Sequence, residues 1–210
     1  ASRNHGSCSS STRGLFGGGE PGPTNIIDYI HISTIGNAID FGDLTLARQQ
    51  VQGTSSPIRG IFTSGEQNLI ILDYITIAST GNAVKFGDLS AAKDNFGGVS
   101  NGVRGVFGSG FGGPSVNVRI NTIDYITFAT TGTAIDFGDR TEAADSSSSC
   151  NMTRGIFSSA FVSPSKTTSN VMDYITIASA GNAIDFGDMI DSSNSTSGNI
   201  SDSHGGLGGF

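Results

Sequence analysis

The chain has 210 residues, a formal net charge of −7 at pH 7, 14% charged residues and 31 glycines. Non-specific binding to a nucleic-acid backbone needs clustered lysine and arginine, whereas the basic residues here are few and scattered. No stretch is apolar over the length that a membrane-spanning helix needs, so we expect no membrane insertion. Helical periodicity is absent over any useful length. The composition indicates a turn-rich, all-β protein with an uncharged polar surface.

Each period of the sequence begins with a polar segment and a short marker. The polar segment Arg48–Ser56 is a candidate for a short strand, which we name strand a. The marker is Arg-Gly, an aliphatic residue and Phe, followed by glycines or serines, and it is expected to form strand b. It begins at Arg13, Arg59, Arg104 and Arg154.

A longer motif follows each marker and predicts two further strands. In its second copy, Tyr74–Ile77 is rich in β-branched and aromatic residues and is predicted as strand c. Gly81 and Asn82 tolerate the positive φ of a hairpin turn, and Ala83–Phe86 is predicted as strand d. The third copy has Thr133 at the asparagine position, so its turn is less well specified. The copies run from Ile27 to Leu44, Leu72 to Leu89, Ile123 to Arg140 and Met172 to Met189.

The spacing of the motif indicates a repeat architecture, because its copies recur about every 45–50 residues. Four short strands in a period of this length are typical of one blade of a β-propeller. We therefore expect a single all-β repeat domain over residues 1–210, with four blades and a C-terminal half-repeat. The blades are expected at about residues 1–45, 46–90, 91–141 and 142–190, and the partial repeat at 191–210.

Both ends of the sequence fall inside a repeat. Ala1–Arg13 aligns with Ala47–Arg59, and His204–Phe210 is a degenerate marker. One expectation is that the chain is a piece of a longer protein. The other is that the spare half-repeat closes the ring beside the first blade, or adds a strand to a neighbouring subunit in a homo-oligomer.

Cys8 and Cys150 both lie shortly before a marker arginine. In a closed ring of four blades their blades are neighbours, and a disulfide would staple the ring. Equivalent points on adjacent blades are usually farther apart than a disulfide tolerates. We therefore favour two unpaired cysteines.

A carboxylate precedes strand c in every copy. One hypothesis is a ring of carboxylates that binds Ca²⁺. We favour a structural role, in which these aspartates accept hydrogen bonds from turn amides or pair with the marker arginines. A residue that is identical in every blade is a unique catalytic group only if it lies on the axis. The aspartates are Asp28, Asp73, Asp124 and Asp173.

The sequence contains no recognisable catalytic or cofactor motif. His5, His31 and His204 have no partner at metal-ligand spacing. Nucleophile-elbow, phosphate-loop and zinc-protease motifs are absent. We expect no enzymatic activity, no cofactor and no metal, with a secreted glycan-active enzyme as the weakest alternative.

The b–c loops differ between the blades, whereas the strands do not. Fixed strands with variable loops are typical of a rigid scaffold that presents a binding surface. The candidate contacts on these loops are Glu20, Gln67, Asn117, Arg119 and Lys166.

These motifs resemble those of known repeat families. A strand followed by glycines, a variable loop, Asp-Tyr and a closing aromatic is similar to a shortened kelch repeat, with Phe41, Phe86, Phe137 and Phe186 at the tryptophan positions. The Arg-Gly-Val/Ile-Phe marker with Asp-Tyr-Ile-Thr-Ile-Ala-Ser-Thr-Gly-Asn-Ala resembles repeat proteins of tailed bacteriophages. The resemblance implies a kelch-like propeller in a virion or tail-associated protein, and it carries over no catalytic residue.

The function that we expect from this reading is non-enzymatic. A phage structural or receptor-binding module would recognise a cell-surface glycan or a neighbouring virion protein, and would be located in the virion. The alternative is a purely architectural subunit that self-assembles through the spare half-repeat.

Overall fold

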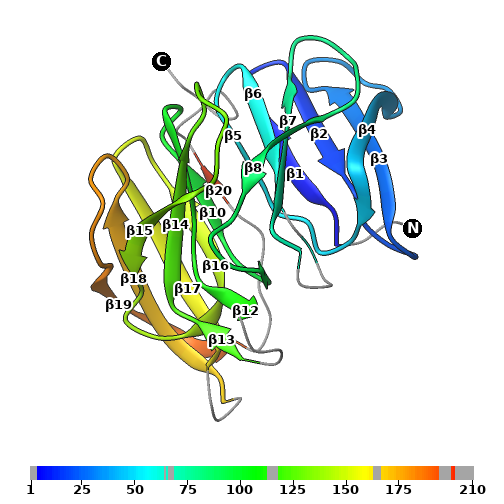
Figure 1. Ribbon diagram of the computed structural model, residues 1–210. Helices are drawn as coiled ribbons and strands as arrows, with labels where there is room; N and C mark the ends of the chain where they lie inside the picture. The colour runs from blue at the N-terminus through cyan, green and yellow to red at the C-terminus, as the bar shows by residue number, and fades with distance from the viewer. Residues whose placement is uncertain are drawn as a thin grey trace.

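The computed structural model describes residues 4–63, 65, 69–112, 118–162, 167–193 and 200–201. Across these ranges the secondary structure consists of β-strands and connecting turns, without a helix. The expectation of an all-β chain is confirmed. The ribbon is shown in Figure 1.

Four antiparallel sheets follow one another along the chain, each built from strands in sequence order around one marker and one motif. We number them sheets 1 to 4. Sheet 1 contains β1 (Gly6–Ser9), β2 (Arg13–Gly17), β3 (Thr24–His31) and β4 (Ile39–Arg48). Sheet 2 contains β5 (Gly53–Ser55), β6 (Arg59–Phe62), β7 (Ile71–Thr76) and β8 (Val84–Asp88). Sheet 3 contains β10 (Gly98–Ser100), β11 (Arg104–Phe107), β14 (Thr122–Thr127) and β15 (Ile135–Asp139). Sheet 4 contains β16 (Ala144–Cys150), β17 (Arg154–Val162), β18 (Ser169–Thr176) and β19 (Ile184–Ser193).

Two additions distinguish the later part of the chain. The connection between β11 and β14 forms β12 (Gly110–Gly112) and β13 (Arg119–Ile120), and β12 also pairs with β9 (Lys93–Asp94) from the connection between β8 and β10, giving a small sheet in the order β13-β12-β9. A fifth strand, β20 (Ile200–Ser201), pairs in parallel with β16 of sheet 4. This part of the expected half-repeat therefore lies on sheet 4 and not beside sheet 1. The first residues of that half-repeat, 191–193, are the end of β19, and 194–199 and 202–210 lie outside the described residues.

The register of the strands is the same in all four sheets, because the same motif pairs in the same way. The marker phenylalanine lies opposite the aspartate that precedes the tyrosine, as in Phe16 with Asp28. A register shift falls just before this aspartate in every c–d pair, as between Ile27 and Asp28. Such irregularities bend a strand and re-aim its side chains. The repeated bend directs each of these aspartates toward the same face of its sheet.

The sheets pack in a row in chain order, and Figure 1 shows sheets 1 and 4 at its opposite ends. The first strand of each sheet contacts the first strand of the next, β1 with β5, β5 with β10 and β10 with β16. A serine ladder runs along this inner edge, where Ser55 Oγ donates to the Ser9 carbonyl at 2.9 Å and Ser100 Oγ to the Ser55 carbonyl at 2.8 Å. The structure shows this row of blade-like sheets and does not show a closed propeller.

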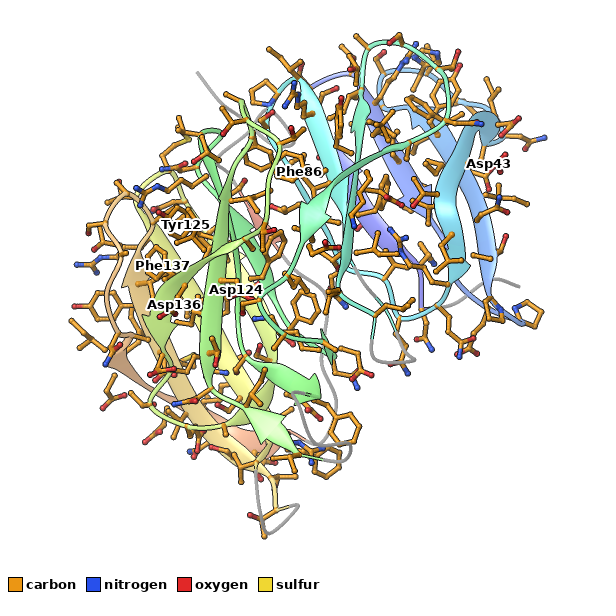
Figure 2. The ribbon with its side chains drawn as sticks, in the orientation of Figure 1. Asp43, Phe86, Asp124, Tyr125, Asp136 and Phe137 are labelled. Atoms are coloured by element: carbon orange, nitrogen blue, oxygen red, sulfur yellow. The ribbon has the colours of Figure 1, made fainter. Side chains whose placement is uncertain are left out.

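The apolar core is divided into three clusters, one at each junction between neighbouring sheets. At the junction of sheets 2 and 3, for example, Phe86 packs with Ile126 and Phe128. Within a sheet, tyrosine and phenylalanine make an edge contact, as Tyr125 and Phe137 do at 5.9 Å between ring centroids (Figure 2). Each sheet therefore buries its faces only against its neighbours, as in other repeat proteins.

The two cysteines are free, as favoured above. Cys8 is buried at the junction of sheets 1 and 2, where its sulfur lies against the backbone of Gly60. Cys150 is half-buried on β16, and its Sγ lies 3.5 Å from the Ser100 carbonyl oxygen. Burial raises the pKa of the Cys8 thiol to about 12.

Candidate binding surface

The marker arginines occupy the same place in every sheet. Each guanidinium stacks on the tyrosine ring of its own sheet at 4.7–4.8 Å from the centroid. In sheets 1 to 3 the same group also donates to a carbonyl of the next sheet, as Arg13 does to Ile77 at 2.8 Å. Arg59 donates to Phe128, and Arg104 donates to Ile177. These three arginines therefore join neighbouring sheets, and none of the four marker arginines forms a hydrogen bond or ion pair with a repeated aspartate.

Backbone hydrogen bonds form a second link at each junction. The Gly81 and Ala83 amides in the c–d turn of sheet 2 donate to the Phe41 and Asp43 carbonyls of sheet 1, both at 2.7 Å. The same pair of bonds recurs from sheet 3 to sheet 2 and from sheet 4 to sheet 3. Asn82 adds a side-chain bond from the Asp43 amide at 3.1 Å. The expected asparagine turn thus joins its sheet to the preceding one.

Buried ion pairs form the third link. At the junction of sheets 3 and 4, Arg140 Nε lies 2.9 Å from Asp173 Oδ2, and both side chains are fully buried. Thr141 Oγ1 donates to the same carboxylate at 2.6 Å. Equivalent pairs occur at the other junctions, between Arg48 and Asp73 at 2.9 Å and between Lys93 and Asp124 at 3.1 Å.

Burial and pairing act in opposite directions on these cations. Burial lowers the pKa of Lys93, and the Asp124 carboxylate opposes that change. The pKa values of Arg48 and Arg140 are lowered for the same reason, with Asp73 and Asp173 in the opposing role. A charge without its partner would be costly in such surroundings. Asp73, Asp124 and Asp173 therefore link neighbouring repeats, because each pairs with a cation that lies at or beyond the end of the last strand of the preceding sheet.

Sequence reasoning missed the cations of these pairs. The first three copies each have one basic residue within a few positions after Phe-Gly-Asp, where Arg48, Lys93 and Arg140 stand. Arg48 and Lys93 both lie five residues after the aspartate of Phe-Gly-Asp, but Arg140 follows it directly, which hides the pattern from a strict alignment. The fourth copy continues with Met189 and Ile190 and has no basic residue there.

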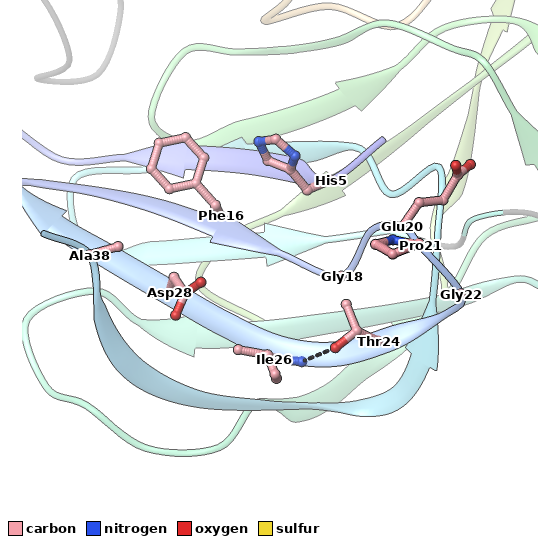
Figure 3. A pocket seen from close by; sticks show the side chains of 10 residues that line it. All are labelled: His5, Phe16, Gly18, Glu20, Pro21, Gly22, Thr24, Ile26, Asp28 and Ala38. Atoms are coloured by element: carbon pink, nitrogen blue, oxygen red, sulfur yellow. Dashed lines mark hydrogen bonds between the residues drawn. The ribbon is translucent and has the colours of Figure 1, made fainter. Parts of the chain in front are cut away.

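Asp28 is the exception among the repeated aspartates. It is half-buried, and its carboxylate forms no hydrogen bond or ion pair with any residue that the structure describes. It opens into a hollow of about 600 Å³, which His5, Phe16, Glu20, Thr24 and Ile26 also line (Figure 3). In sheets 2 to 4 the corresponding aspartate pairs with Arg48, Lys93 or Arg140, which lie at or beyond the end of the last strand of the preceding sheet.

Two outer faces of the row carry groups that are buried at every internal junction. On sheet 1, Ile32 is 48% exposed, whereas the residues at its position in the other sheets are at most 3% exposed. On sheet 4, Phe186 is 47% exposed, whereas the residues at its position are each 3% exposed. The buried counterparts are Ile77, Phe128 and Ile177 for Ile32, and Phe41, Phe86 and Phe137 for Phe186.

Glycine contacts show the same difference between buried and free faces. A Cβ at Gly138 would meet the Gly181 backbone of sheet 4 at 2.5 Å, and one at Gly42 would meet the Gly81 backbone equally closely. At Gly187, the equivalent position of sheet 4, a Cβ would meet no atom of the described residues within 4 Å. We name these two surfaces the sheet 1 face (Asp28, Ile32 and residues 36–38) and the sheet 4 face (Arg154, Phe186, Gly187 and Asp188).

The b–c loop candidates are described only in part. Glu20 lines the hollow beside Asp28 and accepts a hydrogen bond from Asn4 at 2.7 Å. Arg119 pairs with Asp145 at 2.9 Å, and its guanidinium lies 5.3 Å from the ring centroids of both Phe111 and Phe161. Burial raises the pKa of Asp145, and Arg119 opposes that change. Gln67, Asn117 and Lys166 lie outside the described residues.

Within the part of the chain that the structure describes, no group of histidine, cysteine and acidic side chains is arranged to hold a metal ion. That part also contains no helix that could cross a membrane. No family model matches the chain, and a search of curated proteins found no match.

Proposed function

We propose that this chain is a non-enzymatic binding module of a bacteriophage virion or tail, and that it binds proteins through the outer faces of its row of sheets. The resemblance of its marker and motif to phage repeat proteins supports the setting. The use of the repeated charges as links between sheets supports a scaffold role, because these groups are committed to structure.

The contrast between buried and free faces carries the proposal. The sheet 1 face and the sheet 4 face expose apolar side chains and main-chain groups that are paired at each internal junction. Exposed apolar patches with polar rims are typical of protein interaction sites. A partner that presents a sheet face would cover the apolar side chains and satisfy the backbone groups together.

Incorporation into particles tests this proposal. Phage particles would be assembled with Ile32→Asp or Phe186→Asp in this chain, because a buried aspartate would disrupt either face. Val103→Asp is the matched control, since Val103 is 62% exposed in the turn between β10 and β11. We expect quantitative mass spectrometry to find less of both face variants per particle and an unchanged amount of the control. Equal incorporation of all three would refute the proposal.

Glycan recognition by the b–c loops is the second candidate. It is favoured by the small sheet to which the third loop contributes β12 and β13, and by the half-buried rings of Phe111 and Phe161 near Arg119. Exchange of b–c loops between sheets, together with Glu20→Gln, would be assayed by adsorption to host cells. Unchanged adsorption would remove the loops and Glu20 as the contact site.

A further inference from the structure

The sheet 1 face and the sheet 4 face are complementary to one another. At the junction of sheets 3 and 4, the Gly181 and Ala183 amides of sheet 4 donate hydrogen bonds to the Phe137 and Asp139 carbonyls of sheet 3. Sheet 4 offers the same carbonyls at Phe186 and Asp188 on its outer face. Sheet 1 has the same glycine, asparagine and alanine at residues 36–38, all exposed.

The arginine link can be completed in the same way. Arg154 stacks on Tyr174 at 4.8 Å, as the other marker arginines stack on their tyrosines. Those arginines reach the carbonyl of the residue that corresponds to Ile32 in the next sheet. Arg154 is exposed and has no such carbonyl among the residues that the structure describes. The Ile32 carbonyl of another copy would fill this place.

We infer that the sheet 4 face of one copy docks onto the sheet 1 face of a second copy, head to tail. The inference rests on the proposed function and names its partner. Each of the three internal junctions is formed by one surface of the sheet 4 kind and one surface of the sheet 1 kind. The chain has one further surface of each kind, at its two outer faces, so that two copies could form a fourth junction of the same type. Such an interface is heterologous, so that it closes into a ring or continues as a filament. Two copies in a ring would hold eight sheets, within the range of known propellers.

This junction would lack the ion pair of the internal ones. Met189 and Ile190 stand where sheet 3 has Arg140 and Thr141, so Asp28 of the second copy would receive neither a cation nor a hydroxyl. The hollow at Asp28 would remain at the interface. We therefore expect reversible association that is weaker than packing between sheets of one chain.

Sedimentation of the purified chain tests the inference. Between about 1 and 300 µM, a range suited to weak specific interfaces, we expect the average mass to rise above 21.5 kDa. Phe186→Asp and Ile32→Asp should each remain monomeric, and Val103→Asp should associate like the unmodified chain. A mixture of the two face variants should form a one-to-one complex, because one intact face of each kind remains. A monomeric mixture, or association of either variant alone, would overturn head-to-tail docking.

A gain-of-function variant addresses the missing ion pair. Met189→Arg with Ile190→Thr transplants the Arg140-Thr141 pair of sheet 3 to the sheet 4 face. Hydrogen bonds to a charged group are worth enough to lower the dissociation constant by about tenfold or more. The added Asp28→Asn substitution should cancel this gain. If the double variant associates while the unmodified chain stays monomeric, the geometry is right but the natural partner is a different protein with a basic residue, and the inference fails.

The two levels of the hypothesis can fail separately. If Phe186→Asp lowers incorporation into particles while the pure chain is monomeric at all concentrations, the proposed function stands and self-association falls. If the pure chain associates through these faces but the Ile32→Asp and Phe186→Asp substitutions leave incorporation into particles unchanged, self-association is supported and the proposed role of the faces in the virion is refuted.

Discussion

The aspartate that precedes strand c has different surroundings at the junction of sheets 3 and 4 and on the outer face of sheet 1. Asp173 is fully buried with Arg140 and Thr141, whereas Asp28 faces an open hollow with no described partner. Both aspartates precede the same Tyr-Ile and lie opposite a marker phenylalanine. The difference comes from the neighbouring sheet and not from the motif. A repeated residue therefore has a structural role only where an adjacent repeat supplies its partner.

The largest expected difference in stability is between variants that lack the Asp173 carboxylate and variants that lack the Asp28 carboxylate. Asp173→Ala leaves Arg140 buried and unpaired, and we expect a loss of about 3–5 kcal/mol in the free energy of unfolding. Asp28→Ala removes a half-buried group without a described partner and should change it by less than about 0.5 kcal/mol. Urea denaturation of both variants at a low protein concentration makes the measurement. Equal losses would show that Asp28 has a partner of its own.

A smaller difference in stability is expected when a glycine is replaced by alanine at an internal junction and at the equivalent position of the sheet 4 face. Gly138 and Gly187 both have positive φ, of 143° and 132°, so alanine is strained at either position by about 1–3 kcal/mol. Only at Gly138 would the new Cβ also meet backbone of the next sheet, at 2.5 Å. Gly138→Ala should therefore destabilise the chain more than Gly187→Ala in thermal unfolding. The same loss of stability in both variants would mean that the internal junction can rearrange to accommodate the added methyl group.

The smallest effect concerns thiol reactivity at the first junction. With its pKa raised to about 12, the Cys8 thiol remains protonated as pH rises from 7 to about 10, and at pH 8 only about one in ten thousand molecules carries the thiolate. Cys150 is less buried. We expect iodoacetamide at pH 8 to label Cys150 first and Cys8 only on unfolding, as read by peptide mass spectrometry. Rapid labelling of native Cys8 would indicate that the junction of sheets 1 and 2 opens readily.

Much of the local fold could be predicted from the sequence, because local patterns determine it. The β-branched run at Tyr74–Ile77 and the Gly81-Asn82 turn indicate a strand and a hairpin, and β7 and β8 lie there. The extra sheet of β9, β12 and β13 could not be foreseen, since glycines dominate Gly110–Gly112 and only tertiary pairing makes it a strand.

The candidate surface was harder to predict for a related reason. A sequence indicates that Asp73 recurs, but it does not show which distant residue lies against it. Arg140 stands where the first two copies have Leu44 and Leu89, and nothing near it in the sequence indicates that it reaches Asp173 in the next sheet. The outer faces of sheets 1 and 4 are exposed because these sheets lie at the ends of the row. The sequence of a single repeat does not show which repeats lie at the ends.

The division of the core into one cluster per junction has a consequence for how such a chain can evolve. Duplication of one repeat would insert a complete apolar cluster, with its own arginine, turn and ion pair, and would leave the existing clusters unchanged. Deletion would remove one in the same way. The number of repeats can therefore drift by whole units while foldability is preserved, so that chains of different length can share one design of junction.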